Sequence, residues 1–311
     1  MIVTSSNSDM LGNSACICML REAALAVAGR RSTVMISGET GTGKELQARF
    51  IHLNSDRAAA SFVAVDCSTL NETLFESQMF GHVKGSFTGA FRESAGFIRT
   101  AHRGTLFLDE IGELALPLQA KLLRVLQERC VVPLGDVLPQ AVDIRVVVAT
   151  HRNLGEMVRA GTFRQDLYFR LNVVTMVMPA LRERRDDILP LAQHFLRAQA
   201  DLYGEVAKAL SREAIQALLR YDWPGNVREL ANVMERMHVN PGSNRIDAVD
   251  VAASLPMPVA AVRADLCLRE IEREAISEAL RRAKQNKTNA SELLGIDVRT
   301  LNRRLATLQL D

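Results

Sequence analysis

The sequence predicts an α/β fold with a mostly parallel sheet, followed by a smaller helical domain and a last helical module. Apolar, β-branched runs alternate with helical stretches over residues 1–178, which is the pattern of a parallel sheet between helices. One such run, residues 33–37, passes at once into a glycine-rich loop and a helix. After Pro179 we expect helical segments only.

The elements of the α/β part follow in chain order. The first expected helix covers residues 15–28 and places Ile17, Leu20, Ala24 and Val27 near one face. The runs expected to form strands are residues 33–37, 62–65, 105–108 and 144–149, and further helices are expected at 45–53 and 117–127.

Proline and glycine divide the rest of the chain. The turn Trp223-Pro224-Gly225 interrupts the helical pattern, and two prolines within residues 255–258 predict a linker because they stop any helix. Helices are expected at 187–202, 211–220 and 227–237, with a last helical module from about 263 to 310. The predicted divisions are therefore residues 1–178, 179–254, a linker at 255–262, and 263–311.

The composition is that of an ordinary globular chain. Of 311 residues, 48% are hydrophobic and 24% are charged, and the net charge is only +2, so any basic surface must be local. Five scattered cysteines argue against a disulfide framework and favour a reducing, cytoplasmic compartment. No apolar run is long enough to span a bilayer, so we expect no membrane association.

The loop after residues 33–37 predicts a phosphate-binding site. It reads Gly38, Glu39, Thr40, Gly41, Thr42, Gly43 and Lys44, which fits G-x-x-x-x-G-K between a strand and a helix. Backbone N–H groups and the helix N-terminus would face phosphate oxygens, and Lys44 would reach the β- and γ-phosphates of ATP or GTP. Glu45 departs from the general pattern, which has Ser or Thr to help hold Mg²⁺.

Two acids end the apolar run 105–108. Because ligands of parallel sheets bind at the carboxyl ends of the strands, we expect Asp109 to support Mg²⁺ and Glu110 to orient or deprotonate the attacking water. Thr150 and His151 follow the run 144–149 in the same way. They predict either a contact with the γ-phosphate or water, or a turn that only caps the strand.

These motifs, with Gly85, Ser86, Phe87, Thr88, Gly89 and Ala90, resemble the sigma-54-dependent transcription activators of the AAA+ ATPases. The family pattern is G-A-F-T-G-A, so Ser86 replaces an alanine. The resemblance implies that this loop contacts sigma-54 and moves with the nucleotide state. It extends from about residue 11 to residue 310, and it explains Glu45, which the family shares.

Further segments carry the same resemblance. Residues 163–172 are similar to F-R-x-D-L-Y-Y-R-L-N, which implies that Arg164 and Arg170 act on the γ-phosphate of a neighbouring subunit in a ring, expected to be a hexamer. Residues 223–230 match W-P-G-N-x-R-E-L of a helical lid, which implies that Arg228 senses the phosphates. The implied fold is an AAA+ P-loop NTPase, with a parallel sheet sandwiched by helices and a helical lid.

Two positions depart from the family. The family usually has Asn where this chain has Asp66, and the resemblance implies that this Asn holds the catalytic glutamate until the ring meets its target. We therefore expect Asp66 to face Glu110 and repel it. The second departure is His151, where Asn commonly follows the sensor threonine. Both concern the regulation of hydrolysis.

The C-terminal module contains the local basic surface. Residues 281–305 hold seven Lys/Arg against two acids, a local charge of +5, and read as helix, glycine turn, helix. This resembles a Fis-type helix-turn-helix whose second helix enters the DNA major groove. An oligomerisation tail with a solvated basic face is the alternative. The expected DNA-contacting residues are Lys287, Thr288, Arg299, Thr300, Asn302, Arg303 and Arg304.

The resemblance as a whole implies an ATP- and Mg²⁺-dependent activator that binds upstream double-stranded DNA and remodels the closed complex of sigma-54 RNA polymerase. Because the AAA+ segment begins near Met1, we expect no N-terminal regulatory domain. Control is then expected from a trans-acting regulatory protein, from expression level, or, if the sequence is truncated, from the truncation itself. A regulator that works with another sigma factor, or a protein-remodelling AAA+ chaperone, are the alternatives.

Overall fold

The computed structural model of the chain describes residues 10–68, 72–87, 89–240, 244–255, 268–283 and 286–308. The chain divides into two compact units, Met1–Ser254 and Leu255–Asp311. Within the described residues, no helix is both long and apolar enough to cross a bilayer.

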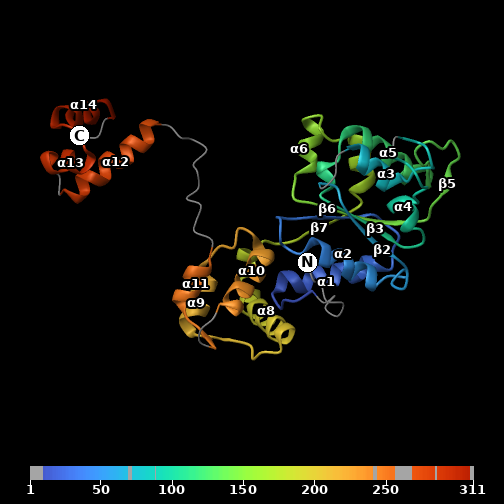
Figure 1. The fold of residues 1–311 in the computed structure, drawn as a ribbon, viewed down its shortest axis with the longest axis horizontal. Coiled ribbons are helices and arrows are strands. Elements are labelled where there is room, and N and C mark those ends of the chain that lie inside the picture. Colours follow the sequence, from blue (N-terminus) through green and yellow to red (C-terminus); the bar gives the residue numbers. More distant parts are fainter. Residues whose placement is uncertain are drawn as a thin grey trace. The chain divides into compact units, whose positions relative to one another are not determined.

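The first unit contains a five-stranded parallel sheet in the order β2-β3-β6-β1-β7 (Figure 1). Its strands are β1 (Val34–Ser37), β2 (Phe62–Asp66), β3 (Thr105–Asp109), β6 (Arg145–Thr150) and β7 (Val174–Val177). The sequence analysis predicted four of these strands within one or two residues and missed β7, a short edge strand with three of its four residues partly or fully exposed. The parallel α/β fold is confirmed.

Helices cover both faces of the sheet because successive strand residues point to opposite sides. Leu106 and Leu108 pack into one core with the helices α3 (Glu72–Phe80), α4 (Gly96–Thr100), α5 (Leu116–Glu128), α6 (Leu154–Arg159) and α7 (Gln165–Leu171). Phe107 packs into a second core with α1 (Ala15–Ala28) and α2 (Lys44–Leu53). A small antiparallel pair, β4 (Cys130–Val131) and β5 (Gln140–Ala141), lies beyond α5.

The lid of the first unit is mainly helical. It comprises the 3-10 turns η2 (Leu181–Glu183) and η3 (Arg185–Asp187), and the helices α8 (Ile188–Tyr203), α9 (Arg212–Arg220), α10 (Asn226–Val239) and α11 (Ala248–Ser254). The expectation of helices alone was wrong, because β8 (Ala209–Leu210) and β9 (Arg245–Ile246) form a two-stranded parallel pair. Trp223 is fully buried, and its indole N–H donates to the Leu218 carbonyl at 2.9 Å.

The second unit is a three-helix module made of α12 (Leu268–Arg282), α13 (Lys287–Leu294) and α14 (Val298–Leu308). Asn286 caps α13, and Asp297 accepts from the Thr300 N–H at 2.8 Å as the sequence predicts for α14. Of the predicted linker, residues 256–262 lie outside the described residues. The module's buried core is Ile276, Ala279, Leu280, Ala290, Leu301 and Leu305.

Candidate functional site: a nucleotide site at the edge of the sheet

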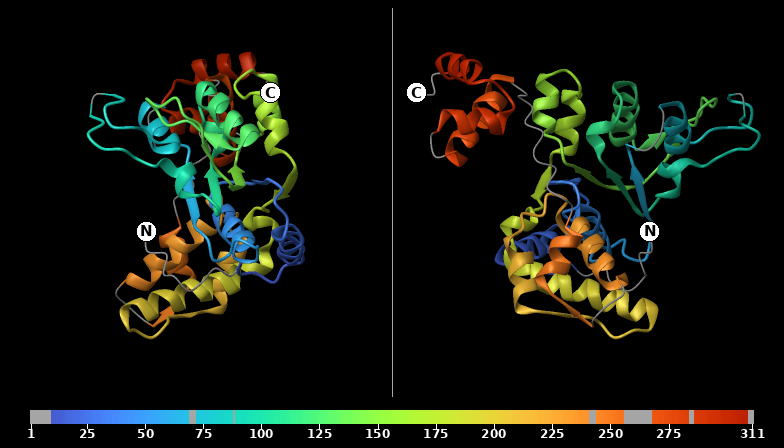
Figure 2. Two further views of the ribbon diagram at one scale, coloured as in Figure 1. Left: turned by 90° about the vertical axis from the view of Figure 1, so that its right-hand side faces the viewer. Right: turned by 60° about the vertical axis from the view of Figure 1, so that its left-hand side comes forward.

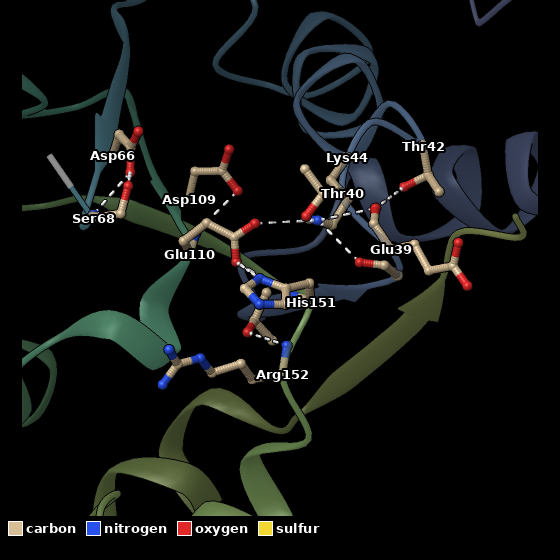
Figure 3. Close-up of polar contacts among 12 residues, drawn as sticks. Glu39, Thr40, Thr42, Lys44, Asp66, Ser68, Asp109, Glu110, His151 and Arg152 are labelled. Atoms are coloured by element: carbon tan, nitrogen blue, oxygen red, sulfur yellow. Dashed lines mark hydrogen bonds and ion pairs between the residues drawn. The ribbon is translucent and has the colours of Figure 1, made fainter. Parts of the chain in front are cut away.

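The carboxyl ends of β1, β3 and β6 bring the predicted catalytic groups together. Ser37 of β1 is in register with Thr150 of β6, and β3 lies on the other side of β6, so Lys44, Asp109 and Glu110 meet at one edge of the sheet. Figure 3 shows these side chains converging, with polar contacts between Lys44, Glu110 and His151.

The phosphate loop has the geometry expected of an anion site. Gly43 precedes α2 with φ 104° and provides no side-chain cap, so the first N–H groups of the helix have no intrahelical acceptor and suit phosphate oxygens. Lys44 is buried, with its Nζ donating to the carbonyls of Gly38 (3.0 Å) and Glu39 (3.3 Å). The Thr42 hydroxyl donates to the Glu39 carbonyl at 2.8 Å. The geometry of these residues is compatible with binding of a nucleoside triphosphate.

Glu45, the departure from the general phosphate-loop pattern, points to another side chain. Its carboxylate pairs with Arg49 one helical turn later, at 2.8 Å from the guanidinium. Both side chains are exposed, so this pair belongs to the surface of α2.

The lid lies directly on the phosphate loop. The backbone N–H groups of Val227 and Arg228, at the start of α10, donate to the Gly41 carbonyl at 3.0 and 3.3 Å. A Cβ on Gly41 would lie 2.3 Å from the Gly225 carbonyl oxygen, so this approach requires glycine. The Arg228 side chain is exposed. Because its backbone N–H bonds to Gly41, Arg228 lies beside the loop that would hold the phosphates.

The side chains of Glu39 and Asn226 connect the same surfaces through further hydrogen bonds. Glu39 accepts hydrogen bonds from Arg182 and, at 3.1 Å, from the Asn226 amide, and these bonds lower the pKa of Glu39 to about 2. The Asn226 amide also donates to the Thr40 carbonyl at 3.0 Å, and its oxygen accepts from the Leu181 N–H at 2.8 Å. Sequence analysis did not identify Asn226 as a site residue.

The acidic pair sits in a strained and polar setting. Glu110 has φ 51°, a left-handed conformation that is uncommon for a residue with a side chain. Burial and the neighbouring Glu110 carboxylate raise the pKa of Asp109. Burial alone would raise the pKa of Glu110, but hydrogen bonds from His151 and the charge of Lys44, 3.5 Å away, hold it below its ordinary value.

Glu110 has a second partner that the sequence analysis missed. His151 Nδ1 lies 2.6 Å from Glu110 Oε2, and the His151 backbone N–H donates to the same oxygen at 3.2 Å. The sequence contained one signal for this contact: Glu110 directly follows β3 and His151 directly follows β6. Neighbouring parallel strands end at the same edge of a sheet, so residues that follow them can meet. Thr150 is buried, and its hydroxyl accepts from the Arg152 N–H at 3.0 Å. That geometry favours the strand-capping turn for Thr150.

The expected position of Asp66 requires a correction. Its carboxylate accepts from the backbone N–H and the hydroxyl of Ser68, at 2.8 and 2.7 Å, and it is in register with Asp109 rather than Glu110. Figure 3 shows Asp66 turned toward Ser68 while Glu110 turns toward Lys44 and His151. The charge of Asp66 helps to raise the pKa of Asp109, so the expected repulsion falls on Asp109.

The two arginines expected to act across a subunit boundary lie on and next to α7. Arg164 pairs with Asp166 at 2.7 Å, and both side chains are exposed. Arg170 donates to the Leu126 carbonyl at 2.9 Å and lines a cavity of about 170 Å³ with Arg31 and Arg129. Neither arginine is among the described partners of Lys44, Asp109 or Glu110 in the same chain, and their action on a neighbouring subunit stays a prediction.

Residues 85–87 and 89–90 belong to a loop that projects away from the sheet in both views of Figure 2. The Gly85 N–H donates to the Ala90 carbonyl at 2.9 Å, and Gly85 and Gly89 both have positive φ. The Phe87 ring is 39% exposed and packs edge-on against His82 at 5.1 Å between centroids. Thr88 lies outside the described residues. Part of the Phe87 side chain is therefore accessible to a partner protein.

The basic residues of the second unit are mostly on its surface. Arg299, Asn302 and Arg303 are exposed along α14, and Lys287 and Thr288 are exposed at the start of α13. Two of the predicted DNA-contacting side chains also have partners inside the module. The Thr300 hydroxyl donates to Asp297 at 2.7 Å, and Arg304 pairs with Glu272 at 2.9 Å.

Comparison with known proteins finds three family models that together match most of the chain. Residues 10–177 match the Sigma-54 interaction domain, residues 182–261 the AAA+ ATPase lid domain, and residues 267–308 the bacterial regulatory protein, Fis family. The transcriptional regulatory protein ZraR of Escherichia coli (strain K12) is 44% identical over 98% of this chain and 70% of its own length.

Other relatives agree. The sigma54-dependent transcriptional activator SfnR of Pseudomonas putida is 50% identical over 73% of this chain and 62% of its own. The crystal structure of NtrX from Brucella abortus in complex with ATP has 31% identity and a TM-score of 0.73, covering 97% of this chain and 70% of that one. The complex of the same protein with ADP has a TM-score of 0.74, with 31% identity, 97% of this chain and 69% of that one.

Proposed function

The chain belongs to the sigma-54-dependent transcription activators, and on that basis we propose that it hydrolyses ATP to convert the closed complex of sigma-54 RNA polymerase into the open complex. The observation that supports this best is the meeting of Lys44, Asp109 and Glu110 at one sheet edge, beside a helix N-terminus that has no side-chain cap. An AAA+ domain binds nucleotide, and these are the groups that hydrolysis needs.

Each residue of the site has a chemical role in this proposal. Lys44 and the first N–H groups of α2 neutralise the β- and γ-phosphates, and Glu110 orients or deprotonates the attacking water. The Asp109 carboxylate is partly exposed at the edge and offers the oxygen ligand that Mg²⁺ prefers. A bound Mg²⁺ would neutralise charge on the phosphate oxygens. Arg228 would contact the phosphates from the lid and so make the lid position sensitive to the bound nucleotide.

A ring completes the proposed site. Arg164 and Arg170 would stabilise the transferring phosphoryl group on the neighbouring subunit of a homo-oligomer, which we propose is a hexamer. The ion pair of Arg164 with Asp166 is exposed and therefore weak enough to be exchanged for a phosphate. A trans-acting regulatory protein is the proposed means of control.

Two surfaces would connect the ring to its targets. The Phe87 ring and Thr88 would contact sigma-54 as the loop of residues 85–90 moves with the nucleotide state. The exposed basic face of α14 would bind upstream double-stranded DNA in the major groove.

The activity is tested on the full chain with Glu110→Gln. This substitution keeps the size of the side chain and removes the base, so we expect ATP binding to persist while the hydrolysis rate falls by about 10²-fold or more. Steady-state phosphate release and the binding of a fluorescent ATP analogue measure the two quantities. A variant that hydrolyses ATP at the wild-type rate would refute the assigned role of Glu110.

The loop is tested by open-complex formation on a sigma-54 promoter, with hydrolysable ATP or without it. We expect Phe87→Ala and Thr88→Ala to abolish open complexes while ATPase activity persists. Ser86→Ala is the matched control, because it restores the family pattern and removes a hydroxyl that has no described partner. Open complexes that form without ATP, or equally well with Thr88→Ala, would contradict the proposal.

A further inference from the structure

Asp187 is a fully buried carboxylate that the proposed ATPase mechanism does not use. It lies in the lid turn η3, and its Oδ1 accepts from the backbone N–H groups of Asn13 and Ser14 at 2.7 and 2.9 Å. Its Oδ2 accepts from the Ser14 hydroxyl. A buried carboxylate is costly unless it is hydrogen-bonded, so these three donors fix the segment before α1 on the lid turn.

Gly12 allows the carboxylate to approach this segment closely. It has φ 135°, a conformation that favours glycine, and a Cβ there would lie 2.8 Å from Asp187 Oδ2. Its carbonyl accepts from the guanidinium of Arg21 on α1. Residues 12–14, which we call the clasp, therefore follow a backbone path that a larger residue at position 12 would disturb.

The same lid turn reaches the phosphate loop through Arg184. This buried residue directly precedes η3, and its guanidinium donates to the Thr42 carbonyl at 2.9 Å. Burial lowers the pKa of Arg184, and the negative charge of Asp187 opposes this shift. Asp187 therefore stabilises the charged guanidinium that holds the backbone just before Gly43 and Lys44.

Apolar contacts provide a second route from the start of the chain to the phosphate loop. Met10 is buried in the same core as Met178. A Cβ at Gly38 would lie 2.7 Å from the Met178 carbonyl oxygen, and one at Gly43 would lie 3.7 Å from its Cε. Met178 therefore packs against both ends of the glycine pattern, in a core that the residue two positions before the clasp completes.

We propose that Asp187 and Arg184 are positioning residues for nucleotide binding, and that the seated clasp keeps the phosphate loop in its binding-competent form. This rests on the proposed function, because ATP is the ligand. Weakening the contacts of the clasp lets an unseated form compete, and apparent affinity falls in proportion to the competent fraction. By reciprocity, bound nucleotide favours the seated clasp as strongly as the seated clasp favours nucleotide.

The first test measures nucleotide binding and ATPase kinetics of Asp187→Asn in the full chain. The amide keeps the size of the side chain and removes the charge that its three donors and Arg184 require. Each hydrogen bond to a charged group can change an equilibrium by about tenfold, so weakening all three should make the seated form a minority. We expect the Kd of a fluorescent ATP analogue and the KM for ATP to rise about 5- to 10-fold.

The value of kcat separates positioning from a merely structural role. Saturating ATP seats the clasp again, so kcat of Asp187→Asn should stay within about twofold of wild type. Loss of folded molecules would instead lower kcat and leave KM unchanged. Asp186→Asn is the matched control, because it makes the same change at the exposed neighbouring aspartate and should alter neither quantity.

Hydrogen exchange of the Asn13 and Ser14 amides tests the clasp without any measurement of activity, because these N–H groups are its donors to Asp187. In Asp187→Asn without nucleotide we expect exchange at least about tenfold faster than in wild type, and a return to near the wild-type rate with a saturating non-hydrolysable ATP analogue. Ser14→Ala removes one donor of three, so its exchange should quicken about tenfold while its affinity stays within about twofold.

Gly12→Ala provides a second variant that keeps the carboxylate and displaces it by steric overlap, so it should raise Kd and KM as Asp187→Asn does. If thermal melting shows that Asp187→Asn is misfolded, Gly12→Ala and Ser14→Ala decide the outcome. Unchanged Kd and KM in the folded variants, a fall in kcat with unchanged KM, or amide exchange that nucleotide does not slow would each overturn the proposal.

Failure of the underlying function has a different appearance. A wild-type chain that binds ATP without hydrolysing it defeats the ATPase assignment, while the affinity and exchange measurements still decide the role of the clasp. A wild-type chain that hydrolyses ATP, together with variants of unchanged affinity, defeats the role of the clasp alone.

Discussion

His52 shows how the environment of a single residue makes the stability of this fold depend on pH. The side chain is buried beneath the sheet, with Nδ1 2.9 Å from the Thr105 hydroxyl and its ring against Phe62. Burial lowers the pKa of His52, and the charges of Arg145 and Arg49 lower it further. The neutral ring is therefore the form compatible with the fold.

The sign of the pH effect follows from this shift. The unfolded chain binds a proton at His52 more readily than the folded chain does, so stability is fully present above pH 6.5 and is lost as pH falls below it. We expect this single group to lower the free energy of unfolding by at most about 1.4 kcal/mol per pH unit. Urea unfolding at a series of pH values from 7.5 to 5 measures it.

His52→Gln keeps a group that can bond to Thr105 but cannot titrate in this range, so its stability should fall less steeply with acid than that of wild type. His102→Gln is the matched control, because His102 is exposed. Parallel pH curves for wild type and His52→Gln would show that His52 does not carry the effect.

At the scale of elements, direct hydrogen bonds join the phosphate loop to helix α10. Asn226 is fully buried with φ 54°, and its side chain makes three hydrogen bonds that join the loop, the lid turn η2 and α10. The helix N-terminus faces Gly41 through two backbone N–H groups. We therefore expect a displacement of the loop by phosphate to be transmitted to the lid through these short, polar contacts.

Asn226→Ala should weaken this coupling. It leaves the Leu181 N–H and the Thr40 carbonyl without their partner, which we expect to reduce the free energy of unfolding by roughly 2–3 kcal/mol and weaken ATP binding. Asn232→Ala, at an exposed position of the same helix, should change stability by less than about 0.5 kcal/mol. Thermal melting and titration with ATP check both. Equal effects of the two substitutions would contradict the coupling.

The sequence predicted the elements that carry a strong local pattern. β1, β3 and β6 are central and buried, so their apolar runs were recognisable, and glycines marked the phosphate loop. β7 was missed because it is a four-residue edge strand with exposed positions. The contact of His151 with Glu110 was missed because it depends on side-chain direction at two strand ends 41 residues apart. Strand order decides such contacts, and periodicity does not show it.

At the scale of the whole molecule, the charge is distributed unevenly. The chain carries a net charge of only +2, while residues 281–305 carry seven Lys/Arg against two acids. The positive excess is therefore local to residues 281–305, because the unit Leu255–Asp311 as a whole carries 10 Lys/Arg against 8 Asp/Glu. The candidate nucleotide site and this basic segment belong to different units of the chain.

DNA binding through α14 should depend strongly on salt. Each phosphate contact releases a counterion, so removal of one contacting arginine lowers the slope of log affinity against log salt by about 1. We expect Arg303→Ala to weaken binding of duplex DNA by the full chain and to reduce this slope. Arg212→Ala, an exposed arginine on α9 of the lid, is the matched control and should leave the slope unchanged. Fluorescence anisotropy with a labelled duplex at 50 to 200 mM salt measures both slopes. Identical slopes for the two variants would show that Arg303 does not contact the DNA.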